Sequence, residues 1–130
     1  MSKPHLQFSV PCLEVKENGG PPSFQHLFYE LPLPEFPFKC PPFFISNGWC
    51  NGKGEFRQSI RILAPDKQQV IIDTGEQPFT LQEQTTPFMA VNMFAEVVFK
   101  EPGICWVQTF LDGSLMLEYP LTIRKAEVKR

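Results

Sequence analysis

The sequence predicts an all-β fold in which antiparallel strands pack as a sandwich. Two turn signals, Glu101-Pro102-Gly103 and Asp112-Gly113, lie between apolar runs of strand length in the C-terminal third of the chain. Pro-Gly suits the central positions of a type II turn, and Asp-Gly between alternating apolar residues is a strong hairpin signal. The 13 Phe and 14 Pro residues, against 8 Gly, are typical of short strands with stiff connections. Long helices are therefore not expected.

The N-terminal part is expected to be less regular. Residues 1–23 contain one possible strand, Leu6–Val15, followed by a Gly-Gly-Pro-Pro stretch that neither a helix nor a central strand can hold. We expect these residues to form an arm whose order depends on docking. Phe24–Leu31 is a candidate strand, and it leads into a Pro/Phe-rich segment in which Phe36 and Phe38 pin the chain to the sandwich.

The middle of the chain shows the alternation of apolar and polar residues that is typical of strands. Phe43–Cys50 reads as a strand, and Gly48 within it suggests a β-bulge. Phe56–Leu63 alternates most clearly, 64–67 (Ala-Pro-Asp-Lys) is a turn, and Val70–Asp73 is a short strand. These elements supply the middle strands of the predicted sandwich.

The C-terminal third predicts three consecutive antiparallel strands. Ala90–Phe99 and Ile104–Leu111 are expected to pair through Pro102-Gly103, and Ser114–Ile123 to return through Asp112-Gly113. With about seven strands and turns roughly every 8–12 residues, the pattern is that of an immunoglobulin-like antiparallel β-sandwich.

The length and the charge of the chain limit its possible domain organisation and its possible partners. Its 130 residues fit a single domain, which we divide into an arm at 1–23, a sandwich core at 24–124 and a polar tail at 125–130. The 12 Lys and Arg residues balance 14 Asp and Glu, so no nucleic-acid partner is expected. No apolar stretch has the length of a signal peptide, or of a membrane span of roughly 18 residues. We therefore expect no membrane partner and a cytoplasmic location.

The four cysteines give no metal-binding pattern. The spacing of Cys12, Cys40, Cys50 and Cys105 lacks the paired Cys-x-x-Cys of zinc sites. In a reducing compartment they are expected to be free thiols that behave as small apolar residues. A disulfide between Cys50 and Cys105 across the two sheets is the alternative. No metal and no cofactor is predicted.

Catalytic motifs are weak in this sequence. His5 and His26 are the candidate imidazole bases, but neither accompanies a nucleophile signature. The glycine-rich stretch 48–54 is one residue too short for a phosphate-binding loop, and it precedes a strand instead of a helix. The sequence therefore predicts no enzyme, unless His26, a cysteine and a carboxylate meet in one pocket.

The most informative candidates for function are apolar residues on the expected outer face of the C-terminal strands. If Cys105, Val107 and Leu111 face the core, four other apolar residues share the opposite face, namely Phe94, Trp106, Phe110 and Met116. The Pro/Phe segment of the chain could cover this face. It could instead be a subunit or partner interface, or a stacking platform for a sugar. An inverted register would put Trp106 and Phe110 in the core.

Several segments also carry a family resemblance. FYELPLPEFPF, FFISNGWCNGKGEF, RILAPDKQQVI and FKEPGICWVQTFLDGSLMLEYPL contain a Pro-Phe segment, an Ala-Pro-Asp-Lys turn and closing Pro-Gly and Asp-Gly hairpins. Together, over roughly residues 24–124, they resemble an uncharacterised family of small bacterial immunoglobulin-like β-sandwich proteins. That family is a domain of unknown function, so the resemblance implies a fold but no site residues.

These observations favour a non-enzymatic interaction module that associates with itself or docks a protein partner through an apolar sheet face. The alternative is a module that binds a small ligand of the carbohydrate type through exposed aromatic side chains.

Overall fold

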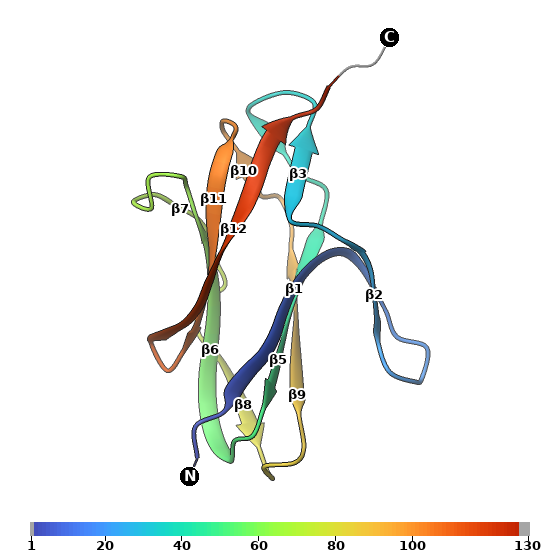
Figure 1. Cartoon of the computed structure of the whole chain (residues 1–130), viewed down its shortest axis with the longest axis vertical. Helices are drawn as coiled ribbons and strands as arrows, with labels where there is room; N and C mark the ends of the chain where they lie inside the picture. Colours follow the sequence, from blue (N-terminus) through green and yellow to red (C-terminus); the bar gives the residue numbers. More distant parts are fainter. Residues whose placement is uncertain (1, 128–130) are drawn as a thin grey trace.

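A computed structural model describes residues 2–127 of the chain, and this part consists of strands, turns and loops without a helix (Figure 1). No helix that could cross a lipid bilayer therefore occurs among these residues. The 12 strands are β1 (His5–Lys16), β2 (Ser23–Leu27), β3 (Glu30–Leu33), β4 (Phe38–Lys39), β5 (Phe43–Cys50), β6 (Gly54–Leu63), β7 (Val70–Asp73), β8 (Gln77–Leu81), β9 (Phe88–Phe94), β10 (Val98–Phe99), β11 (Gly103–Leu111) and β12 (Ser114–Lys125).

The strands form two large sheets and one small one. A four-stranded sheet has the order β2-β1-β5-β9, and β10 pairs with β4 in the small sheet. A six-stranded sheet has the order β3-β12-β11-β6-β7, with β8 also paired to β6. Strands β3 and β12 are parallel, and the other described pairs are antiparallel. The two large sheets lie side by side as layers in Figure 1.

The all-β prediction is confirmed, but the strands are more numerous than the about seven predicted. The predicted strand Ala90–Phe99 is divided at Glu96, whose φ of 58° is left-handed and interrupts an extended strand. Its first part is β9, in the four-stranded sheet, and its second part is β10, in the small sheet. Phe24–Leu31 likewise divides into β2 and β3, which lie in different sheets. The chain thus changes sheets where the sequence predicts continuous strands.

One of the two predicted hairpins is confirmed and the other is wrong. β11 and β12 pair from Leu111 opposite Ser114 onward. Asp112 and Gly113 between them have φ values of 48° and 82°, both positive as a type I′ turn requires. Pro102 and Gly103 do not join paired strands. They connect β10 to β11, and these two strands belong to different sheets.

The N-terminal residues, for which an arm is predicted, take part in the four-stranded sheet. β1 pairs with β2 on one side and with β5 on the other. The Pro/Phe-rich segment behaves as predicted, because Phe36 and Phe38 pack against the main core cluster. Of the predicted polar tail, Lys125 ends β12, while residues 128–130 lie outside the described part of the chain.

The buried side chains form two apolar clusters. The larger cluster takes residues from both large sheets, among them Phe43, Ile45, Ile60, Phe94, Val107 and Leu121. The smaller one consists of Trp49, Phe56, Phe79, Leu81 and Leu111. Burial of these large side chains is the main source of stability for such a fold.

Three buried polar residues separate the two clusters, and we call them the polar seam: Asn47 on β5, Gln58 on β6 and Thr109 on β11. The amide nitrogen Nδ2 of Asn47 lies 3.3 Å from Gln58 Oε1 and 3.3 Å from Thr109 Oγ1. Trp49 Nε1 donates to the same Gln58 oxygen at 2.8 Å. These bonds join the two large sheets through the centre of the core, where an unpaired polar group would be costly.

Candidate functional site

Trp106 and Phe110 lie on the outer face of the six-stranded sheet, as the alternation of β11 predicts. Cys105, Val107 and Leu111 are at most 2% exposed, so the opposite side of β11 faces the core. The aromatic side chains are half-buried, which means that other side chains cover part of each ring.

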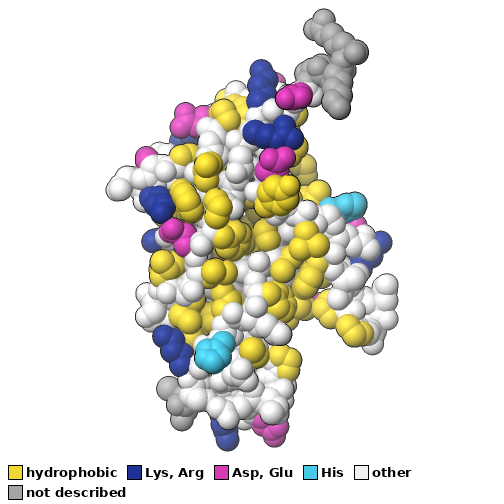
Figure 2. Space-filling view, in the orientation of Figure 1, with side chains coloured by type: hydrophobic (Ala, Val, Ile, Leu, Met, Phe, Trp, Pro, Cys, Tyr) yellow, Lys and Arg dark blue, Asp and Glu magenta, His cyan; other side chains and the backbone are white. Residues whose placement is uncertain are grey.

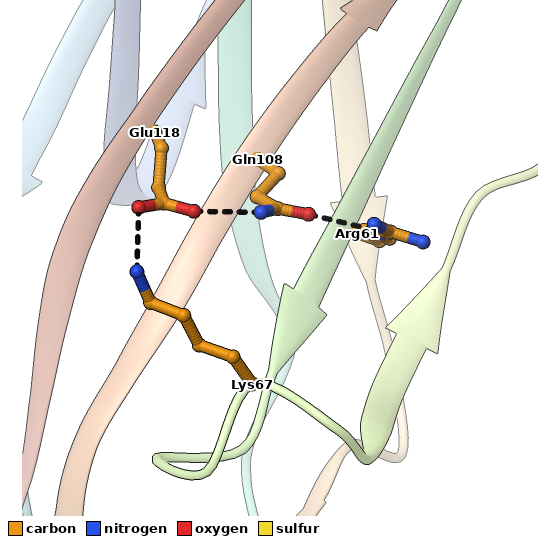
Figure 3. Close-up of polar contacts among 4 residues, drawn as sticks. All are labelled: Arg61, Lys67, Gln108 and Glu118. Carbon is orange, nitrogen blue, oxygen red and sulfur yellow. Dashed lines mark hydrogen bonds and ion pairs between the residues drawn. The ribbon is translucent and has the colours of Figure 1, made fainter. Parts of the chain in front are cut away.

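A row of polar side chains crosses this outer face between the two aromatic residues. Glu118 on β12, Gln108 on β11 and Arg61 on β6 are direct cross-strand neighbours. Arg61 Nε donates to Gln108 Oε1 at 2.7 Å, and Gln108 Nε2 donates to Glu118 Oε2 at 2.6 Å (Figure 3). Lys67 Nζ reaches the other carboxylate oxygen of Glu118 at 2.9 Å. The bonds from Gln108 and Lys67 hold the pKa of Glu118 below its usual range.

The two cations of this row also cover the aromatic rings. Lys67 Nζ lies 4.2 Å from the centroid of the Trp106 ring, and Arg61 Cζ lies 4.8 Å from that of Phe110. Both are cation–π contacts by distance. One face of each ring is thus occupied by a basic side chain, Arg61 from β6 or Lys67 from the turn after it, whereas the Pro/Phe segment packs elsewhere, against the core.

The turn between β6 and β7 positions Lys67. The Asp66 carboxylate accepts hydrogen bonds from the backbone N–H groups of Gln68 and Gln69, at 2.8 and 3.2 Å, and these bonds lower its pKa. Lys67 N donates to Ala64 O at 2.8 Å, and Lys67 itself has a left-handed φ of 59°. Asp favours such turns because its short side chain bonds nearby backbone N–H groups.

Two of the four residues predicted for this face lie elsewhere. Phe94 is 2% exposed and stacks on Phe43 in the core, with 5.3 Å between ring centroids. Phe94 was predicted to point outward because one strand was expected from Ala90 to Phe99. The break at Glu96 ends that strand, so the side chains before and after the break do not follow one alternation. Met116 packs against the smaller core cluster, because the register of β11 and β12 shifts between Thr109 and Phe110. A β-bulge of this kind turns the following side chains to the other face.

The cysteines and His26 are the candidate catalytic groups of this sequence. All four cysteines are free, and burial raises the pKa of Cys40 and of Cys105 to about 11, which disfavours the nucleophilic thiolate. His26 is exposed on β2 with a left-handed φ of 59°. Among residues 2–127 no three His, Cys, Asp or Glu side chains lie close enough to hold a metal ion.

A second outer face, on the four-stranded sheet, was missed from the sequence. Three cross-strand rows on the side away from the core run from β1 through β5 to β9, and they contain one polar side chain, that of Ser46. The rows are Phe8–Gly48–Met89, Val10–Ser46–Val91 and Cys12–Phe44–Met93. We call these nine positions the apolar face. Val91 is 38% exposed and Met93 is 63% exposed, so the end of this face along β9 is open to solvent.

Gly48 in this face is not the β-bulge that the sequence suggests. The pairing of β5 with β9 is regular through Gly48, and the irregularity lies in β1, between Leu6 and Phe8. A side chain at position 48 would overlap the ring of Phe8, which lies against the sheet there. Close approach of a ring to the backbone therefore explains this glycine.

The sandwich has two lateral edges, at each of which an outer part of one large sheet lies beside the other sheet, and the contacts at these two edges differ. On one side Ser9 Oγ and Tyr119 Oη lie 3.1 Å apart and join β1 to β12, and Figure 2 shows hydrophobic side chains gathered over this side. Burial raises the pKa of Tyr119 to about 12, although the bond with Ser9 acts in the opposite direction. On the other side, cavities of about 270 and 240 Å³ lie between β9 and the strands β7 and β8. β9 therefore borders an open groove.

Twelve chains of solved structures are similar to this one. One is the Pseudomonas fluorescens alkylpurine DNA glycosylase AlkC, in a complex with DNA that contains an abasic site analog. It matches with a TM-score of 0.53 and 10% identity, over 74% of this chain and 28% of the glycosylase chain. A likeness at this identity concerns the fold alone. A search of the curated proteins finds no match to this chain.

The family to which the chain belongs follows from its sequence. A model of the DUF6941 family, which is described as a family of unknown function, matches residues 7–124, from the third residue of β1 to the last but one of β12. The chain therefore belongs to the DUF6941 family of unknown function.

Proposed function

We propose that the protein is a non-enzymatic interaction module, an immunoglobulin-like β-sandwich that docks a protein partner or a second copy through an apolar sheet surface. The strand orders support the immunoglobulin-like assignment. β1-β5-β9 and β12-β11-β6-β7 correspond to the A-B-E and G-F-C-C′ orders of immunoglobulin domains. A bacterial origin and a cytoplasmic location, which suits free thiols, belong to the same proposal.

The observation that carries this proposal is the apolar face of the four-stranded sheet. Antiparallel sheets with one face on the core usually present polar side chains on the other face. Here the three outward rows contain no charged residue, and Met93 is 63% exposed. Of the nine positions, Val91 and Met93 are exposed, whereas Cys12 and Ser46 are 0% exposed, so the accessible part of this face is the strip along β9. Apolar side chains exposed side by side on a sheet usually mark an association site. The docking surface is thus the apolar face, and not the face around Trp106 that the sequence analysis favoured.

Site-specific photo-crosslinking in the native cell tests the proposal. A photoreactive phenylalanine analogue at Met93 is expected to give a product of defined mass. The matched control is Leu115, which is 51% exposed on the other large sheet and should give no such product. No product from Met93, or the same products from both positions, would contradict docking through the apolar face.

Small-ligand binding through Trp106 and Phe110 has less support. A sugar ring stacks on an open aromatic face, and Lys67 and Arg61 already occupy one face of each ring. Titration with a panel of glycans, followed by tryptophan fluorescence, tests this alternative, and a saturable change abolished by Trp106→Ala would favour it.

A further inference from the structure

β9 is an open sheet edge without the usual protection. It is the last strand of its sheet, it is seven residues long, and it contains neither proline nor a charged residue. Among the other outer strands of the described structure, β3 contains Pro32, β8 contains Pro78, and the four-residue β7 ends in Asp73. β2, at the opposite edge of the same sheet, is five residues long and has a left-handed φ of 59° at His26. Free strand edges pair readily with other chains, and proteins usually block them with proline, charge or short length. The edge of β9 is therefore competent to pair with another strand.

The sequence of β9 is nearly a palindrome. From Phe88 to Phe94 it reads Phe-Met-Ala-Val-Asn-Met-Phe, and the departure from symmetry is Ala90 against Asn92. Two copies placed antiparallel about Val91 therefore bring like residues opposite each other. Phe88 of one copy meets Phe94 of the other, Met89 meets Met93, and Val91 meets Val91. A two-fold interface needs such self-complementarity, because each contact occurs twice.

The side chains brought together by this pairing suit an interface. Met89, Val91 and Met93 all lie on the apolar face, so the pairing would extend this face across both copies. Cross-strand apolar pairs stabilise a sheet, whereas like charges directly opposite destabilise it, and the strand offers no charge to repel. Methionine adapts its shape to a partner surface, which favours the two Met–Met pairs.

We propose that β9 is the contact between two copies of this chain, paired antiparallel about a two-fold axis at Val91 so that their four-stranded sheets become continuous. This inference rests on the proposed function, since it names the second copy as the occupant of the edge of the apolar face.

Charge-exchange variants at Val91 test the inference, because this residue alone faces itself. Val91→Lys and Val91→Glu each place two like charges opposite each other and should weaken dimerisation by about tenfold or more. An equimolar mixture of the two variants should restore dimers, since Lys then faces Glu. Analytical ultracentrifugation measures the dissociation constant, and circular dichroism checks folding. Leu115→Lys, on the other large sheet, is the control that should leave dimerisation unchanged.

A second pair of variants fixes the register. Met89→Lys with Met93→Glu places opposite charges across the two-fold axis and should dimerise, whereas Met89→Lys with Met93→Lys should not. A wild-type protein that is monomeric at high micromolar concentration overturns the inference, as does failure of the Val91 mixture to associate. In either case a product from Met93 crosslinked to a different protein would leave the proposed function standing.

Discussion

Replacement of Gln58 by methionine tests the polar seam. Gln58 is 1% exposed, and its Oε1 accepts from Trp49 Nε1 at 2.8 Å and from Asn47 Nδ2 at 3.3 Å. Methionine keeps the length of the side chain but removes this acceptor, so the indole N–H is left buried without a partner. A buried donor without a hydrogen-bond partner costs about 1–3 kcal/mol of folding stability. Asn47 keeps its bond to Thr109, so we expect a total loss of about 2–4 kcal/mol in unfolding free energy.

A double-mutant cycle isolates the hydrogen bond from the change in packing. In a Trp49→Phe background the indole N–H is absent, and Gln58→Met should then cost about 1–3 kcal/mol less than in the wild type. Guanidinium denaturation followed by far-UV circular dichroism measures each free energy without relying on tryptophan fluorescence. Gln82→Met, at an exposed position, should change stability by less than about 0.5 kcal/mol. An equal cost of Gln58→Met in both backgrounds would refute this reasoning.

Two further predictions concern pH and packing. The pKa values of Cys40 and Cys105 (about 11) and of Tyr119 (about 12) are raised by burial, so the neutral forms stabilise the fold. That contribution to stability is complete below about pH 8.5 and is lost as the pH rises toward the folded-state pKa values. Thermal melts across this pH range measure the loss, and a Tyr119→Phe variant should lose less stability above about pH 10. Gly48→Ala should lower the unfolding free energy by about 1–3 kcal/mol, because the new methyl group overlaps the Phe8 ring. Chemical denaturation should show partial recovery when Phe8→Leu is added, and an undiminished loss would count against the overlap.

The sequence predicts best those features that depend on neighbouring residues alone. The Asp-Gly turn is correct because both residues tolerate positive φ, and β5 occupies the predicted range, Phe43–Cys50. The Pro-Gly turn shows the limit of such local reasoning. Its chemistry indicates that the chain changes direction, but it carries no information about which sheet the next strand joins.

The candidate site was predicted less well because it depends on pairing between distant strands. Met116 was assigned to the outer face by simple alternation, and the bulge in the pairing with β11 turns it inward. The contact of Lys67 with Trp106 requires the fold of the β6–β7 turn, which alternation does not describe. The apolar face could have been suspected from the uncharged run of β9, but its rows appear only when β1, β5 and β9 are aligned.

The polar seam also has a consequence for how β5 finds its place in the sheet. Apolar residues occupy both sides of this strand, with Phe43 and Ile45 toward the core and Phe44 on the apolar face. Hydrophobic alternation alone therefore discriminates poorly between the native pairing and one slipped by a single residue, which would exchange the two sides. In the slipped pairing Asn47 would leave the core, and Gln58 would lose that partner. The buried hydrogen bonds thus penalise mispaired β5, and they give this strand a unique orientation that its apolar residues do not specify.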